Sequence, residues 1–230
     1  RIINLGADCH RVSVVGNLKR AVSTRHPLRS DGEAMEGHGP SPLLVVGSSH
    51  RGEEEILIGV YLSLKQRFAR LRMVLAPRHP ERFADVEKLL QAKGLDYEKK
   101  SRANGGSDFN EDILLLDTLG DLQDFYALAD VAFVGGSLVD AGGHNLLEPA
   151  RLGKPVLFGP FTSNFASLAL EMTQRHAGIQ VAGAEDLTRE LSDLLADPEK
   201  CRAMGKEASQ VAAEDDGVME RNLALAQRYL

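Results

Sequence analysis

The feature that most constrains the fold of this chain is a regular alternation of short apolar runs with longer amphipathic stretches from residue 43 onward. Near-continuous apolar runs are typical of strands buried on both faces of a parallel sheet. Their alternation with helices favours right-handed crossovers. The sequence therefore predicts a doubly wound, Rossmann-like α/β fold. Its strands are expected at Leu43–Val46, Met73–Ala76, Ile113–Leu116, Val131–Val134, Pro155–Phe158 and Ile179–Val181.

The stretches between the expected strands have helical periodicity. Apolar residues recur at every fourth position from Ile56 to Phe68 and predict a helix over 53–68. A second helix is expected to start near Phe83 and to stop at Gly94. Further helices are expected at 119–129, 184–196, 198–213 and from residue 218.

Composition narrows the class of protein. Of the 230 residues, 43% are hydrophobic and 26% are charged, which is typical of a globular domain. The net charge of −6 argues against a nucleic-acid partner, which requires a basic face. Cys9 and Cys201 lie far apart, without the spacing of a zinc site. No signal peptide or membrane-spanning run is visible, and the start at Arg1 is interpreted as mid-domain sequence of a longer protein.

The segment Val131–Pro149 carries the strongest functional signal. A predicted strand breaks at Gly135, Gly136 and Ser137, and a second glycine pair precedes Asn145 and Glu148. Glycines between a strand and a helix let backbone N–H groups approach an anion, and a carboxylate one turn later suits ribose hydroxyls. We therefore expect a nucleotide-sugar pocket. The alternatives are an N-cap role for Asn145 and a first-turn acid at Glu148.

Two other strand ends carry candidate residues, and ligands of open parallel sheets bind beyond the carboxyl ends of strands. Arg78 lies between two prolines, where its guanidinium is expected to contact phosphate or to pair with Glu81. His50 has no obvious role in a core. The acids that follow it, including Glu54 and Glu55, are explained by the dipole of the helix that they begin.

Taken together, these motifs resemble one family. They are Gly47-Ser-Ser-His50, Pro77-Arg-His-Pro-Glu-Arg82, Val134-Gly-Gly-Ser-Leu-Val and Gly142-Gly-His-Asn-Leu-Leu-Glu-Pro149, supported by Gly16-Asn-Leu-Lys19 and Gly153-Lys-Pro-Val. In this order the set resembles the 3-deoxy-D-manno-octulosonic acid (Kdo) transferases of lipid A assembly. The resemblance covers nearly the whole chain and is weakest over 20–41 and around Asn104.

The resemblance implies the carboxyl-terminal, donor-binding half of a GT-B glycosyltransferase. Its donor would be CMP-Kdo. By position in the motifs, Arg78 and His79 would contact the CMP phosphate, aided by Gly135, Gly136 and Ser137. Glu148, backed by Asn145, would hold the ribose, and Ser49 and His50 would face the cleft between two domains.

The resemblance also implies what lies outside the chain. The reaction would invert the anomeric centre without a metal or other cofactor. The catalytic base, the surface for the lipid A precursor and the contact with the cytoplasmic side of the inner membrane would belong to a missing amino-terminal half. No catalytic residue is therefore expected here, and the chain itself is expected to be soluble and inactive alone.

These expectations divide the chain into three parts. Residues 1–41 are interpreted as the start of a domain with a flexible linker loop and a candidate strand at Val12–Val15. Residues 42–216 form the nucleotide-sugar-binding domain, and the helix in 217–230 would pack on the missing half. Two alternatives remain: a sugar-nucleotide epimerase or other GT-B enzyme that uses a UDP-sugar, and a non-catalytic nucleotide-sugar-binding module.

Overall fold

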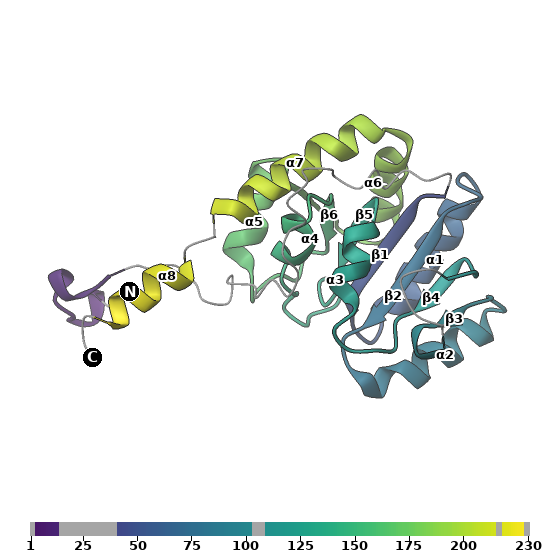
Figure 1. Cartoon of the computed structure of the whole chain (residues 1–230), viewed down its shortest axis with the longest axis horizontal. Helices are drawn as coiled ribbons and strands as arrows, with labels where there is room; N and C mark the ends of the chain where they lie inside the picture. The colour runs from purple at the N-terminus through teal and green to yellow at the C-terminus, as the bar shows by residue number, and fades with distance from the viewer. Residues whose placement is uncertain (1–2, 14–40, 103–108, 215–217, 228–230) are drawn as a thin grey trace.

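The body of the protein is a seven-stranded parallel sheet with the order β3-β4-β2-β1-β5-β6-β7 (Figure 1). The computed structural model describes residues 3–13, 41–102, 109–214 and 218–227. The predicted doubly wound parallel sheet is confirmed. Its strands are β1 (Leu43–Ser49), β2 (Arg72–Pro77), β3 (Glu98–Lys99), β4 (Ile113–Leu115), β5 (Val131–Val134), β6 (Val156–Phe158) and β7 (Gly178–Gln180).

Two parts of the strand prediction differ from the structure. β3 was not predicted, because its two residues, Glu98 and Lys99, are charged and give no apolar signal. The strand expected at Val12–Val15 is absent at Val12 and Ser13, which have no regular secondary structure. Its other two residues, and the linker loop up to residue 40, lie outside the described residues.

Helices follow most of the strands, as the periodicity predicts. The bounds of α6 agree with the sequence, and α1 ends three residues earlier than predicted. At the start of α7 the carboxylate of Asp197 accepts the N–H groups of Glu199 and Lys200, which caps the helix. The helices are α1 (Glu53–Lys65), α2 (Phe83–Ala92), α3 (Leu122–Leu128), α4 (Leu147–Arg151), α5 (Ala166–Gln174), α6 (Ala184–Ala196), α7 (Pro198–Glu214) and α8 (Val218–Ala226).

Side chains of alternate strand residues point to opposite faces of the sheet. Leu44 and Val46 pack with α1, α2 and α6 on one face, whereas Val45 packs with α3 on the other. α4 and α5 cover the second face beside β5 and β6. α7 contributes Met204 to the first core and Val211 to the second, so it joins the two layers. Burial of β1, β2, β4, β5 and β6 on both faces explains their apolar runs.

The sheet reverses its direction of winding at β1. β2, β4 and β3 lie on one side of this strand, and β5, β6 and β7 lie on the other. At such a switch point the loops after neighbouring strands diverge and leave room for a ligand. The loops after β1, β2 and β5 are therefore the place to look for a site.

α8 confirms the helix predicted from residue 218, and Figure 1 draws it apart from the sheet. Its packing on a further domain stays a prediction. None of the helices in the described ranges combines the length and the apolar character needed to cross a bilayer.

Candidate functional site

The end of β1 bends at Ser48, which has a positive φ of 57°. The pairing register with β2 shifts between Gly47 and Ser49 at this point. Ser49 is fully buried, and its hydroxyl lies 3.3 Å from Oε1 of Glu54. The prediction that Ser49 faces the cleft is therefore wrong for its side chain. Its carbonyl accepts the N–H of Arg78 at 3.0 Å, so Ser49 instead helps to hold the loop after β2.

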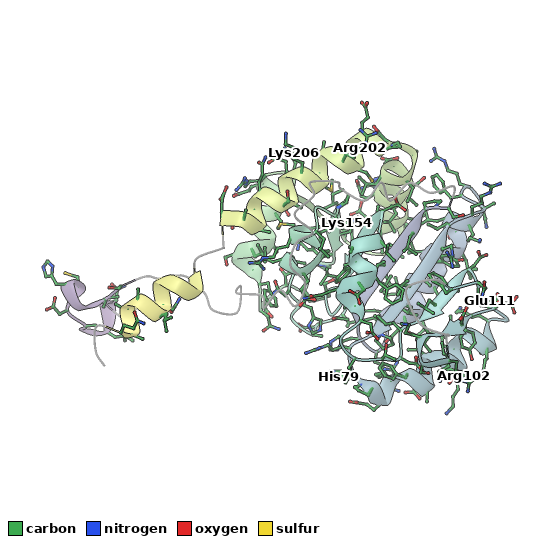
Figure 2. The ribbon with its side chains drawn as sticks, in the orientation of Figure 1. His79, Arg102, Glu111, Lys154, Arg202 and Lys206 are labelled. Carbon is green, nitrogen blue, oxygen red and sulfur yellow. The ribbon has the colours of Figure 1, made fainter. Side chains whose placement is uncertain are left out.

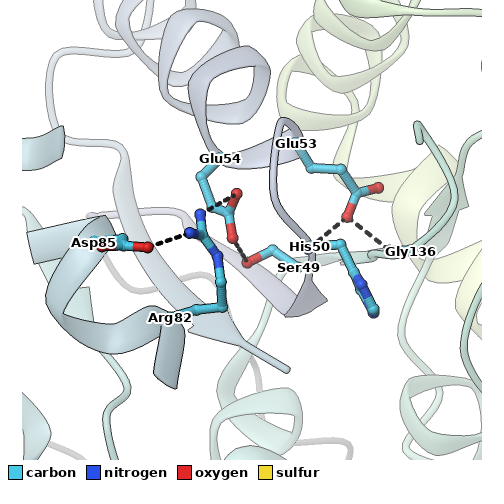
Figure 3. A network of polar contacts seen from close by, with 7 residues as sticks. All are labelled: Ser49, His50, Glu53, Glu54, Arg82, Asp85 and Gly136. Atoms are coloured by element: carbon cyan, nitrogen blue, oxygen red, sulfur yellow. Dashed lines mark hydrogen bonds and ion pairs between the residues drawn. The ribbon is translucent and has the colours of Figure 1, made fainter. Parts of the chain in front are cut away.

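The three acids that begin α1 have different environments. Glu54 is fully buried and lies 3.5 Å from the Arg82 guanidinium, as Figure 3 shows. Burial raises the pKa of the Glu54 carboxyl, and Arg82 and Ser49 partly offset this. The helix dipole alone therefore does not explain Glu54. It is sufficient for Glu55, which is exposed.

The glycine loop after β5 was expected to approach the phosphate of a ligand, but in the structure its N–H groups bind a carboxylate of the same molecule. The N–H groups of Gly136 and Ser137 donate to the carboxylate of Glu53 at 2.7 and 2.9 Å. The N–H of Gly135 donates to the carbonyl of Gly47. The hydroxyl of Ser137 donates to the carbonyl of Val134. Since these donors are occupied, the structure argues against the predicted phosphate contact through these three residues.

Three imidazoles meet beside this loop. Nε2 of His50 lies 2.8 Å from Nε2 of His144, and the two rings are stacked with centroids 5.0 Å apart. His79 meets His50 edge-on at a centroid distance of 5.3 Å. The structure thus brings the predicted His50 and His79 together and adds His144.

Burial and neighbouring charges lower the pKa of two of these imidazoles, His50 and His144. Burial, followed by the charges of His50, Arg78 and His79, lowers the pKa of His144 to about 4. Burial also lowers the pKa of His50, while Glu53 opposes this shift. Arg78 acts on both rings and is itself exposed, as is His79 at the surface of the molecule (Figure 2). A solvent-facing cation therefore borders the imidazole pair.

Asn145 and Glu148 lie at the start of α4. Oδ1 of Asn145 accepts the N–H of Leu147 at 3.1 Å, so this side chain serves the turn that begins the helix. Glu148 is half-buried, and burial raises the pKa of its carboxyl against the opposing charge of Arg78. Burial, followed by the charge of Glu148, raises the pKa of Tyr126. Glu148 therefore lies within electrostatic range of both Arg78 and Tyr126.

The sequence did not single out Glu53 or His144. Glu53 is one of three adjacent acids, and nothing local distinguishes it from Glu54 and Glu55. His144 lies directly beside Asn145 in the glycine-rich segment, and this position is the signal that could have identified it.

Metal ligands do not gather at this site among the described residues. In that part of the chain, the group with ligand atoms close enough to hold an ion consists of Asp8, Cys9 and His10, all exposed. Figure 1 draws their segment apart from the sheet. The site instead offers an exposed guanidinium, three imidazoles and a half-buried carboxylate. An exposed guanidinium binds anions directly through charge-assisted hydrogen bonds.

Comparison with known proteins places the chain in a family. No protein-family model matches the chain. It is 38% identical over 84% of its length to a bifunctional glycosyltransferase/methyltransferase of Fusobacterium nucleatum, of which it covers 30%. It is 32% identical over its full length to the 3-deoxy-D-manno-octulosonic acid transferase of Haemophilus influenzae, of which it covers 54%. The chain thus spans about half the length, or less, of these curated relatives.

A solved structure matches the fold as well as the sequence. The C-terminal CMP-Kdo binding domain of WaaA from Acinetobacter baumannii is 30% identical to the chain and superposes with a TM-score of 0.69. The match covers 74% of this chain and 89% of that domain. Sequence identity over the full length and agreement of the fold lead to the same conclusion. The chain belongs to the 3-deoxy-D-manno-octulosonic acid transferase family.

Proposed function

We propose that this chain is the donor-binding half of a Kdo transferase and that it binds CMP-Kdo at the switch point of the sheet. One observation carries the proposal: an exposed Arg78, an imidazole cluster and a half-buried Glu148 converge at the carboxyl ends of β1, β2 and β5. The family relationship supports it, since a relative of the same fold is a CMP-Kdo binding domain.

The phosphate of the donor is assigned to Arg78 and His79. Both side chains are exposed, and both follow the end of β2. A guanidinium forms two parallel, charge-assisted hydrogen bonds with phosphate oxygens. Because the N–H groups of the glycine loop already bind Glu53, we assign the phosphate to Arg78 and His79 without the aid first expected from that loop.

The ribose is assigned to Glu148. A carboxylate beside two vicinal hydroxyls accepts a hydrogen bond from each, and the ionised form is the better acceptor. Arg78 favours this form, because its positive charge opposes the upward shift that burial gives to the pKa of Glu148. Asn145 contributes by holding the start of α4, and with it the backbone that carries Glu148.

In the proposed reaction, a carboxylate on the other half of the enzyme takes the proton from a hydroxyl of the lipid A precursor. The oxygen attacks the anomeric carbon of Kdo, and the bond from that carbon to the CMP phosphate breaks with inversion. Arg78 stabilises the negative charge that develops on the departing CMP. We assign this role to cationic side chains rather than to a metal. Membrane contact at the cytoplasmic face of the inner membrane would belong to the other half.

Titration calorimetry of this chain with CMP, CDP and UDP tests the donor assignment. CMP is expected to bind more tightly than UDP, and the reverse order would contradict the proposal and favour a UDP-sugar enzyme such as an epimerase. The intact parent protein, assayed with CMP-Kdo and a lipid A precursor, tests the reaction. CMP binding without transfer by the intact protein would favour a non-catalytic binding module.

A further inference from the structure

The carboxylate of Glu53 is the most completely hydrogen-bonded acid of the described site. Its side chain is fully buried. Oε2 accepts the N–H of His50 at 2.8 Å and the N–H of Gly136 at 2.7 Å. Oε1 accepts the N–H groups of Ser137 and Leu138 at 2.9 and 2.8 Å. Each oxygen thus accepts two N–H groups, and Figure 3 shows two of these bonds.

These four donors come from two loops that are distant in the sequence. His50 follows β1, whereas the other three residues follow β5, more than 80 positions later. β1 and β5 are neighbours at the switch point of the sheet. Glu53 therefore links the two loops that border the candidate site, because its carboxylate accepts hydrogen bonds from both of them.

The imidazole pair rests on these same two loops. The backbone N–H of His50 is held by Glu53, and Gly136 lies under both rings. A methyl group in place of the Gly136 hydrogen would come within 2.9 Å of the His144 ring and 3.3 Å of the His50 ring. The Nε2 contact between His50 and His144 thus depends on the relative position of the two backbones that Glu53 joins.

Glu53 also determines where an external anion is attracted. A cluster of N–H groups after a strand attracts an anion, but here the carboxylate of Glu53 already occupies the cluster. In the described site, Arg78 is the cationic group left to a ligand, with the imidazoles beside it. We infer that Glu53 is a positioning residue of the donor site: it fills the N–H cluster and fixes the loops that place His50 and His144 beside Arg78. This inference rests on the proposed function.

The test compares Glu53→Ala and Glu53→Gln with Glu55→Gln, an exposed acid of the same helical turn. Glutamine has the shape of glutamate, but its NH₂ group would face two N–H donors. Glu53→Gln loses two of the four bonds and Glu53→Ala loses all four, and either loss is expected to weaken CMP binding at least about tenfold. The Glu55→Gln control should bind CMP as the unmodified chain does.

Two further readouts separate positioning from a general effect on stability. Nitrogen-15 NMR of the imidazoles reports the contact between His50 and His144 without any ligand, and this contact should be lost in Glu53→Gln. Formate, a small carboxylate that fits the emptied cluster, should restore CMP affinity or thermal stability to Glu53→Ala and leave the unmodified chain unchanged. If Glu53→Ala does not fold without formate, Glu53→Gln and its imidazole spectra decide the matter.

The inference is overturned if a folded Glu53→Gln keeps both the imidazole spectrum and the CMP affinity of the unmodified chain, or if formate affects Glu53→Ala and the unmodified chain alike. Failure of the unmodified chain to bind CMP would count against the proposed function instead. In that case the imidazole spectra and the formate response still decide the role of Glu53.

Discussion

The Nε2 atoms of His50 and His144 lie 2.8 Å apart, although the two residues are separated by 94 positions in the sequence. At this distance one ring must donate and the other must accept, so the contact requires that one of these two nitrogens carries a proton and the other does not. If both rings were imidazolium, two N–H donors and two positive charges would face each other, next to Arg78. The pair therefore makes the site sensitive to pH.

The stability of the protein is expected to fall as the pH decreases from about 6.5 to about 4. Burial lowers the pKa of His144 to about 4, whereas an unfolded histidine titrates near 6.5. Between these values the unfolded chain binds a proton that the folded chain does not, so acid favours unfolding. The loss is on the order of 2 kcal/mol after allowance for the partial exposure of the ring.

Urea unfolding of the unmodified chain and of His144→Gln at several pH values measures this effect. Buried acids with a raised pKa, such as Glu54 and Glu148, contribute with the opposite sign, since their protonation favours the folded state. The acids contribute equally in both proteins. The difference between the two dependences of the unfolding free energy on pH is therefore due to His144. Equal slopes of stability against pH would contradict the prediction.

Replacement of Arg78 is expected to weaken CMP binding more than any other single change in the loop after β2. A hydrogen bond to a charged group contributes about 1.5–3 kcal/mol, which predicts a loss of about 10- to 150-fold for Arg78→Ala. Arg78→Lys should restore part of the affinity but not the two-pronged contact. Calorimetry at two salt concentrations measures both effects. Arg70→Ala, an exposed arginine before the amino end of β2, is the matched control.

The ribose assignment predicts a coupling between Glu148 and the 2′-hydroxyl of the ligand. For the unmodified chain, 2′-deoxy-CMP should bind about 10-fold or more weakly than CMP, because a hydrogen bond to a carboxylate is lost. For Glu148→Ala, the two nucleotides should bind with equal affinity. Calorimetry of both proteins with both nucleotides gives a double-mutant cycle, which measures the coupling free energy between Glu148 and the 2′-hydroxyl. A 2′-deoxy penalty that survives in Glu148→Ala would assign the ribose to another residue.

Two glycines within helices are expected to respond to alanine in opposite directions. Gly59 in α1 is exposed and has no neighbour within 4 Å of an added methyl group, so Gly59→Ala should stabilise the protein by about 0.5–1 kcal/mol. At Gly205 in α7 the same methyl group would overlap the carbonyl oxygen of Gly153, so Gly205→Ala should destabilise it by about 1–3 kcal/mol. Thermal unfolding of both variants measures the contrast. Stabilisation by both would show that α7 moves away from Gly153 at little cost.

The central strands of the sheet were predictable because they are apolar on both faces, and this leaves a clear signal in runs such as Val131–Val134. The site was predictable only in part. Arg78 and Glu148 follow from their positions after strands, but the burial of Ser49 depends on a register shift that no local pattern indicates. Three of the four N–H donors to Glu53 lie more than 80 residues away in the sequence, so the selection of Glu53 from three adjacent acids is a tertiary effect.

The loops of the site contact one another through their backbones. A side chain at Gly135 would collide with the backbone of Ser48 and Ser49, and one at Gly159 with that of Ser137. This scaffold therefore leaves little room for variation in the loops themselves. The exposed side chains of Arg78 and His79 take part in none of these close backbone contacts. During evolution, the donor preference of such a domain could change by substitution of a few exposed side chains, while the backbone contacts between the loops stay the same.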